Sequence, residues 1–145
     1  MSSVLIVDDE PLIRQLMKRW LAAAGYDTRE APDADVAIGL LTVSPSDVIL
    51  CDIQMPGHDG LWLVAQVRER FPNVAVVLAT GLDTVPPGIS LGSGVVEYLL
   101  KPFARDQVLR AVTRAVEWGQ ARAARAPKRA GAHDPLAEWM HTRRS

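Results

Sequence analysis

Acidic side chains directly follow two apolar runs of the sequence. Asp8, Asp9 and Glu10 come after the first run, and Asp52 comes after a run in the middle of the chain. Carboxylates held close together repel one another and raise each other's pKa values unless a cation neutralises them. Carboxylate oxygens favour Mg²⁺, which takes six oxygen ligands and is commonly held by carboxylates together with phosphate oxygens. If the fold brings these side chains together, they predict a magnesium site.

Two further apolar runs end in a hydroxyl and in an amine. Thr80 ends the run that starts at residue 74, and Lys101 follows the run that starts at residue 96 and precedes Pro102. Taken alone, Thr80 is an ordinary strand residue, Lys101 is a solvated lysine, and Asp8 and Asp9 cap the next helix. The acids, the hydroxyl and the amine nevertheless all stand at matching strand ends. The complete set therefore indicates a functional site at this edge of the sheet.

The elements that must position these residues read as alternating strands and helices. Runs rich in β-branched and apolar residues predict strands at 4–7, 47–51, 74–79 and 96–100, and the alternating stretch 26–31 predicts an edge strand. Apolar residues at helical spacing predict helices over 12–24, 36–41, 61–67 and 108–116. This order implies an α/β fold with a doubly wound, five-stranded parallel sheet, whose ligands bind beyond the carboxyl ends of the strands.

One crossover and the chain end depart from this regular pattern. Paired prolines and glycines between residues 81 and 94 oppose a long helix, so an irregular or shortened fourth helix is expected there. Residues 1–118 carry ten basic and fifteen acidic side chains, whereas 119–145 carry six and two. The sequence therefore predicts one domain over 1–118, and a helix extension with a basic flexible tail or linker over 119–145.

Composition excludes several classes of function. The 145 residues, 48% hydrophobic and 23% charged, fit one soluble globular domain. A net charge of -1, and a basic tail without the pattern of a recognition helix, predict no specific binding of nucleic acid by this chain. The single Cys51 cannot form an internal disulfide, and no leader or membrane-spanning run is visible, so a cytoplasmic location without membrane contact is expected.

Four motifs together resemble those of response regulator receiver domains of two-component signal transduction. The resemblance runs from about residue 3 to residue 118. The motifs are Val7-Asp8-Asp9-Glu10, the stretch 52–60, Ala79-Thr80-Gly81 and Leu100-Lys101-Pro102-Phe103. The resemblance implies a flavodoxin-like fold, in which a histidine kinase donates a phosphoryl group to Asp52.

The resemblance also implies a role for each matching residue. Asp8, Asp9, Asp52 and the backbone carbonyl of Gln54 would hold Mg²⁺, and Lys101 would contact the phosphoryl group. Thr80 and Tyr98 would be the switch residues, and the bond before Pro102 would be cis. The chain would then be a signalling switch that changes a protein-binding surface, and its only reactions would be self-phosphorylation from a donor and slow loss of the phosphate. Its output partner and dimerisation stay open, since relatives often use the region that is irregular here.

Three other interpretations compete with a phosphorylated switch. A degenerate receiver would be a phosphorylation-independent binding module, but such chains usually lose one of the acids, the Thr or the Lys. A haloacid-dehalogenase-like phosphohydrolase would need a second Asp where Gln54 stands. Binding of DNA by the tail would be non-specific.

In the loop after Asp52, Gly57 and Gly60 are expected to serve the turn and His58 to be solvated.

Overall fold

A computed structural model describes residues 2–81 and 94–130, and of 126–130 the backbone only. The strands are β1 (Ser3–Val7), β2 (Asp27–Ala31), β3 (Val48–Asp52), β4 (Ala75–Thr80) and β5 (Val95–Leu100). The helices are α1 (Pro11–Ala23), α2 (Ala34–Val43), α3 (Gly60–Arg70) and α4 (Arg105–Ala130). The irregular crossover and the flexible tail predicted from the sequence lie in 82–93 and 131–145, outside the described residues.

The five strands form one parallel sheet in the order β2-β1-β3-β4-β5. This arrangement confirms the predicted doubly wound α/β fold and places the alternating strand at an edge. β3 and β4 are buried at every residue because helices cover both faces, which explains why their apolar residues are consecutive. Val7 pairs with Cys51, and Asp52 pairs with Ala79. The carboxyl ends of β1, β3 and β4 therefore lie level at one edge of the sheet.

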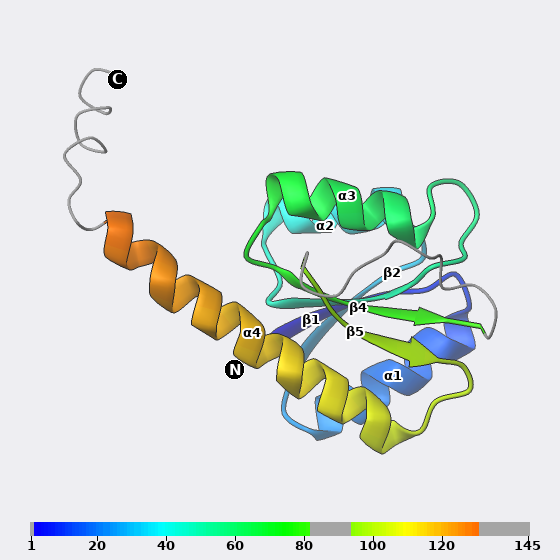
Figure 1. The fold of residues 1–145 in the computed structure, drawn as a ribbon. Helices are drawn as coiled ribbons and strands as arrows, with labels where there is room; N and C mark the ends of the chain where they lie inside the picture. Colours follow the sequence, from blue (N-terminus) through cyan, green and yellow to red (C-terminus); the bar gives the residue numbers. More distant parts are fainter. Residues whose placement is uncertain (1, 82–93, 131–145) are drawn as a thin grey trace.

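The sheet is the middle layer of three (Figure 1). Alternate strand residues such as Leu5 and Ile49 pack against α2 and α3, whereas Ile6 and Leu50 pack against α1 and α4. Each face therefore has its own apolar core, as the alternation of side chains along a strand requires. These two cores hold the strand ends, and with them the polar residues that follow, in fixed positions.

Local capping explains where the helices begin. Asp33 opens α2 by accepting a hydrogen bond from Val36 N at 2.8 Å, and Asp59 opens α3 in the same way with Trp62 N at 2.9 Å. At α1 the N-cap residue is Glu10, whose side chain makes no capping hydrogen bond. Glu10 is therefore not explained as an ordinary helix cap.

The last helix, α4, is longer than the apolar spacing predicts. It continues without interruption through Trp118 and Gly119 to Ala130, so it crosses the boundary that the sequence suggested, and the division of the chain at residue 118 stays a prediction. Residues 120–125 are exposed, and this end of α4 extends beyond the sheet (Figure 1). Within 2–81 and 94–130, no helix is both long and apolar enough to cross a membrane.

Candidate functional site

Three carboxylates from two neighbouring strand ends meet at the carboxyl edge of the sheet. Asp8 and Asp9 follow β1, Asp52 ends β3, and one oxygen of each lies within 4.8 Å of the others. Asp8 and Asp52 are buried, whereas Asp9 is exposed. The fold thus brings together the three acids that the sequence proposed as metal ligands. Such a group of hard oxygen donors suits Mg²⁺.

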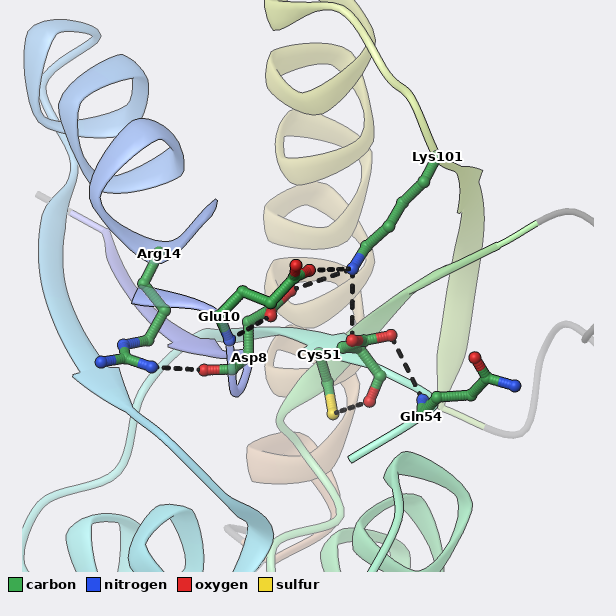
Figure 2. Close-up of polar contacts among 7 residues, drawn as sticks. Asp8, Glu10, Arg14, Cys51, Gln54 and Lys101 are labelled. Atoms are coloured by element: carbon green, nitrogen blue, oxygen red, sulfur yellow. Dashed lines mark hydrogen bonds and ion pairs between the residues drawn. The ribbon is translucent and has the colours of Figure 1, made fainter. Parts of the chain in front are cut away.

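Lys101 reaches this cluster from β5, across the end of β4 (Figure 2). Its Nζ lies 3.2 Å from Asp52 Oδ2, 3.3 Å from Asp8 Oδ2 and 3.5 Å from Glu10 Oε1. The Glu10 contact was not predicted, because Glu10 lies in the turn after β1 and the direction of its side chain does not follow from sequence spacing. One ammonium is therefore shared by three carboxylates.

The charges at the site do not balance. Burial raises the pKa of both Asp8 and Asp52, and the attraction of Lys101 offsets only part of that effect. Burial acts to lower the pKa of Lys101, but the nearby carboxylates of Asp8 and Asp52 together outweigh burial and raise it. The site therefore keeps an excess of negative charge that a further cation would neutralise.

Backbone amides fix the orientation of the two buried carboxylates. Glu10 N donates to Asp8 Oδ1 at 2.9 Å, and Gln54 N donates to Asp52 Oδ1 at 3.2 Å. Each carboxylate thus presents one oxygen to a backbone amide and the other to Lys101. The side chain of Gln54 extends away from the cluster (Figure 2). Ligation of a metal by the Gln54 carbonyl stays a prediction.

The two predicted switch residues lie on the neighbouring strands β4 and β5. Thr80 is fully buried at the end of β4, and its backbone carbonyl accepts a hydrogen bond from Lys101 N at 2.7 Å. Tyr98 lies on β5, paired with Leu78, and packs against the core on the α2 and α3 side. Its hydroxyl is buried without a hydrogen-bond partner among the described residues, and burial raises its pKa. Neither switch role is tested by this geometry.

The loop between β3 and α3 has tighter packing than its sequence suggests. A Cβ at Gly60 would lie 2.4 Å from the Asp52 carbonyl oxygen and 2.8 Å from Ile53 Cα, so no larger residue fits there without a shift of the backbone. Gly57 has a φ of 77° and serves the turn, as expected. Gly60 instead begins α3 and allows that helix to approach the backbone of Asp52. The turn-rich sequence gave no sign of this close contact.

His58 in the same loop is exposed, as expected. Half of its side chain is accessible, and its ring stacks on Trp62 with centroids 3.7 Å apart, while Nδ1 lies 3.1 Å from Asp35 Oδ1. These two contacts were not predicted, because the positions of α2 and α3 relative to the loop do not follow from sequence separation. The bond between Lys101 and Pro102 is cis, as the motif implied.

Comparison with known proteins gives a consistent result. The model of the family described as response regulator receiver domain matches residues 4–113. The DNA-binding transcriptional regulator NtrC of Klebsiella pneumoniae is 34% identical over 134 residues, which cover 92% of this chain and 28% of that protein. The C4-dicarboxylate transport transcriptional regulatory protein DctD of Rhizobium meliloti is 30% identical over 116 residues, 79% of this chain and 25% of that protein.

Solved structures agree with the sequence comparisons. The receiver domain of NtrX from Brucella abortus superposes with a TM-score of 0.73 at 32% identity, covering 79% of this chain and 98% of that one. The fold is therefore the flavodoxin-like fold of receivers. The chain spans only about a quarter of the length of the NtrC and DctD proteins it matches.

Proposed function

The chain belongs to the response regulator receiver domain family, and from this premise we propose that Asp52 accepts a phosphoryl group from a histidine kinase in a magnesium-dependent reaction. The domain would then act as a signalling switch that alters a protein-binding surface. The observation that carries the proposal is that the Lys101 ammonium contacts both Asp8 and Asp52. These are two of the three carboxylates, with Asp9, whose oxygens lie within 4.8 Å of one another. A cluster with this charge and geometry is suited to a phosphoryl group and a divalent cation.

The acceptor chemistry requires little beyond position and charge. An oxygen of the Asp52 carboxylate forms a bond to phosphorus while the bond from phosphorus to the donor's imidazole nitrogen breaks, and that nitrogen keeps the electron pair. The product on this chain is an acyl phosphate. No proton has to leave Asp52 if it is ionised, so neutralising the oxygens of the transferred group matters more than acid–base catalysis.

Asp8, Asp9, Asp52 and the backbone carbonyl of Gln54 would hold Mg²⁺. The residues fit this ion, because their donors are hard oxygens and because, among the described residues, the buried carboxylates exceed the one ammonium that faces them. When bound, the ion would supply positive charge to the phosphoryl oxygens. The two backbone amides that orient Asp8 and Asp52 would help to hold these carboxylates in place for the ion.

Lys101 and Thr80 would stabilise the phosphorylated state. Lys101 pairs with the acceptor before transfer, and the same ammonium would follow the new negative charge on the phosphoryl oxygens. The hydroxyl of Thr80 would donate a hydrogen bond to another of these oxygens, and Tyr98 would turn inward as Thr80 moves. The result is a changed surface at the carboxyl edge of the sheet and on β5.

The place of this domain in signalling is part of the same proposal. The relatives NtrC and DctD carry the names of transcriptional regulators, so the output of the receiver would pass to another domain or protein. We propose residues 1–118 as the phosphorylated unit and 119–145 as an extension or linker. We propose a cytoplasmic location for this unit.

Intact-mass spectrometry after incubation with acetyl phosphate tests the proposal. The wild-type chain should gain the mass of one phosphoryl group when Mg²⁺ is present and none in excess chelator, and Asp52→Asn should gain none. If the wild type gains no adduct under conditions that phosphorylate an active receiver, the chain is instead a phosphorylation-independent binding module.

A further inference from the structure

Asp8 and Asp9 lie in the connection between β1 and α1. The side chain of Arg14, in the first turn of α1, holds this connection in place. Arg14 Nη1 donates a hydrogen bond to the backbone carbonyl of Asp8 at 2.6 Å (Figure 2). Arg14 Nε also lies 3.3 Å from Glu30 Oε1 on β2. The guanidinium thus bridges the turn and the neighbouring edge strand.

The bridge supplies a hydrogen-bond donor to a backbone carbonyl that lies past the end of β1. β1 ends at Val7, and although Asp8 N still donates to the Ala31 carbonyl at 3.2 Å, the Asp8 carbonyl lies beyond the strand. A hydrogen bond from a charged donor is shorter and stronger than one between neutral groups. The Arg14 side chain is only 16% exposed, so solvent screens this contact little.

The contact bears on the carboxylate of Asp8 through the backbone. Asp8 Oδ1 accepts from Glu10 N at 2.9 Å, and Asp8 Oδ2 lies 3.3 Å from Lys101 Nζ. Both distances depend on where the backbone of the turn lies. Among the contacts of the described residues, Arg14 touches no oxygen of the Asp8, Asp9 or Asp52 carboxylates, so it cannot serve as a ligand or as a direct counter-charge.

We propose that Arg14, held by Glu30, is a positioning residue that sets the affinity of this site for Mg²⁺ by fixing the turn that carries Asp8 and Asp9. The inference rests on the proposed function, because it takes these acids as the ligands of the ion. Groups that orient metal ligands typically change metal affinity by about 10- to 100-fold when they are removed.

A purely structural role for Arg14 makes a different prediction. Arg14 N donates to the Glu10 carbonyl at 3.1 Å, and this helical hydrogen bond remains whatever the side chain. Lys18, one turn later, contacts the other oxygen of Glu30 at 3.2 Å but does not contact the turn. Lys18→Gln is therefore a matched control, since it removes a cation from the same Glu30 and leaves the turn tied.

The experiment is a titration of the full chain with Mg²⁺, followed by the backbone amide resonances of Asp9 and Glu10. Arg14→Gln should weaken Mg²⁺ binding about 10-fold or more, and should shift the Glu10 amide even before metal is added. Lys18→Gln should stay within about twofold of the wild type. Arg14→Lys should fall between, because a single ammonium cannot reproduce the two-pronged contact. Urea unfolding of each metal-free variant checks that the chain is folded during the titration.

Each other outcome decides against the inference. If Arg14→Gln binds Mg²⁺ as the wild type does, Arg14 does not position the ligands, while the site itself stands. If Lys18→Gln loses as much affinity as Arg14→Gln, the effect comes from the general charge or stability of α1. If the wild type does not bind Mg²⁺ at all, the proposed metal site and this inference are both wrong.

Discussion

Lys101 Nζ lies 3.2 Å from Asp52 Oδ2, although 49 positions separate the two residues in the sequence. The contact is possible because β3 and β5 are parallel and end at the same edge of the sheet, with only β4 between them. The ammonium pairs with the proposed acceptor. It would also be near enough to pair with a phosphoryl group on that carboxylate.

Replacing Lys101 should show how much the buried carboxylates destabilise the chain when they lose their cation. Lys101→Met should lower the free energy of unfolding of the metal-free chain by about 1–3 kcal/mol, because Asp8 and Asp52 lose their common cation. Urea denaturation at neutral pH measures the change. Lys18→Met, at a half-exposed ion pair, should cost less than about 1 kcal/mol. Equal losses in the two variants would contradict the assigned role of Lys101.

The raised pKa values of Asp8 and Asp52 predict an unusual dependence of stability on pH. Because burial raises both, the folded chain binds these two protons more tightly than the unfolded chain does. The contribution of these groups to stability therefore grows as the pH falls from neutral toward about 4, the ordinary value for Asp. Urea denaturation without metal should show this trend in the wild type and a weaker one in Asp52→Asn. An identical pH dependence in both proteins would rule the explanation out.

The close approach at Gly60 predicts a cost for the smallest side chain. Gly60→Ala would bring a methyl group against the Asp52 carbonyl and should destabilise the chain by about 1–3 kcal/mol. Gly39→Ala is the control, since a Cβ there meets nothing within 4 Å and α2 should gain about 0.5–1 kcal/mol. Thermal unfolding of the two variants should therefore shift in opposite directions. A stabilised Gly60→Ala would show that the loop adjusts freely.

Replacing Tyr98 by Phe should not lower the free energy of unfolding. Tyr98→Phe removes a buried polar atom that has no hydrogen-bond partner in the described parts of the chain. Since an unsatisfied buried group costs about 1–3 kcal/mol, the unphosphorylated variant should be as stable as the wild type or more stable. Urea denaturation gives the answer. A clear loss of stability would mean that the hydroxyl makes a stabilising contact in solution.

Much of the fold and the cluster could be predicted from the sequence. Consecutive apolar residues located β3 and β4 to within one residue, and alternation located the edge strand β2. Because parallel strands end at one edge, the positions of Asp8, Asp52 and Lys101 after their strands were enough to expect them close together. Their contacts in the structure agree with that expectation.

The contacts that depend on side-chain direction could not be predicted in this way. The stacking of His58 on Trp62 and the bridge from Arg14 to the turn depend on rotamers and on how loops pack. The close approach of Gly60 depends on the distance between two backbones, which composition does not encode. Apolar spacing marks only the part of a helix that packs on a core, so it does not show where α4 ends.

Reductive mapping of the phosphoryl acceptor can show whether Asp52 itself receives the phosphoryl group. The chain is incubated with acetyl phosphate and Mg²⁺, treated with borohydride, which reduces an acyl phosphate to an alcohol, and digested for peptide mass spectrometry. Asp52 should be converted to homoserine only when both acetyl phosphate and Mg²⁺ are present, and Asp8 and Asp9 should stay unchanged. Conversion of another residue, or of none while an active receiver treated in parallel is converted, would show that Asp52 is not the acceptor.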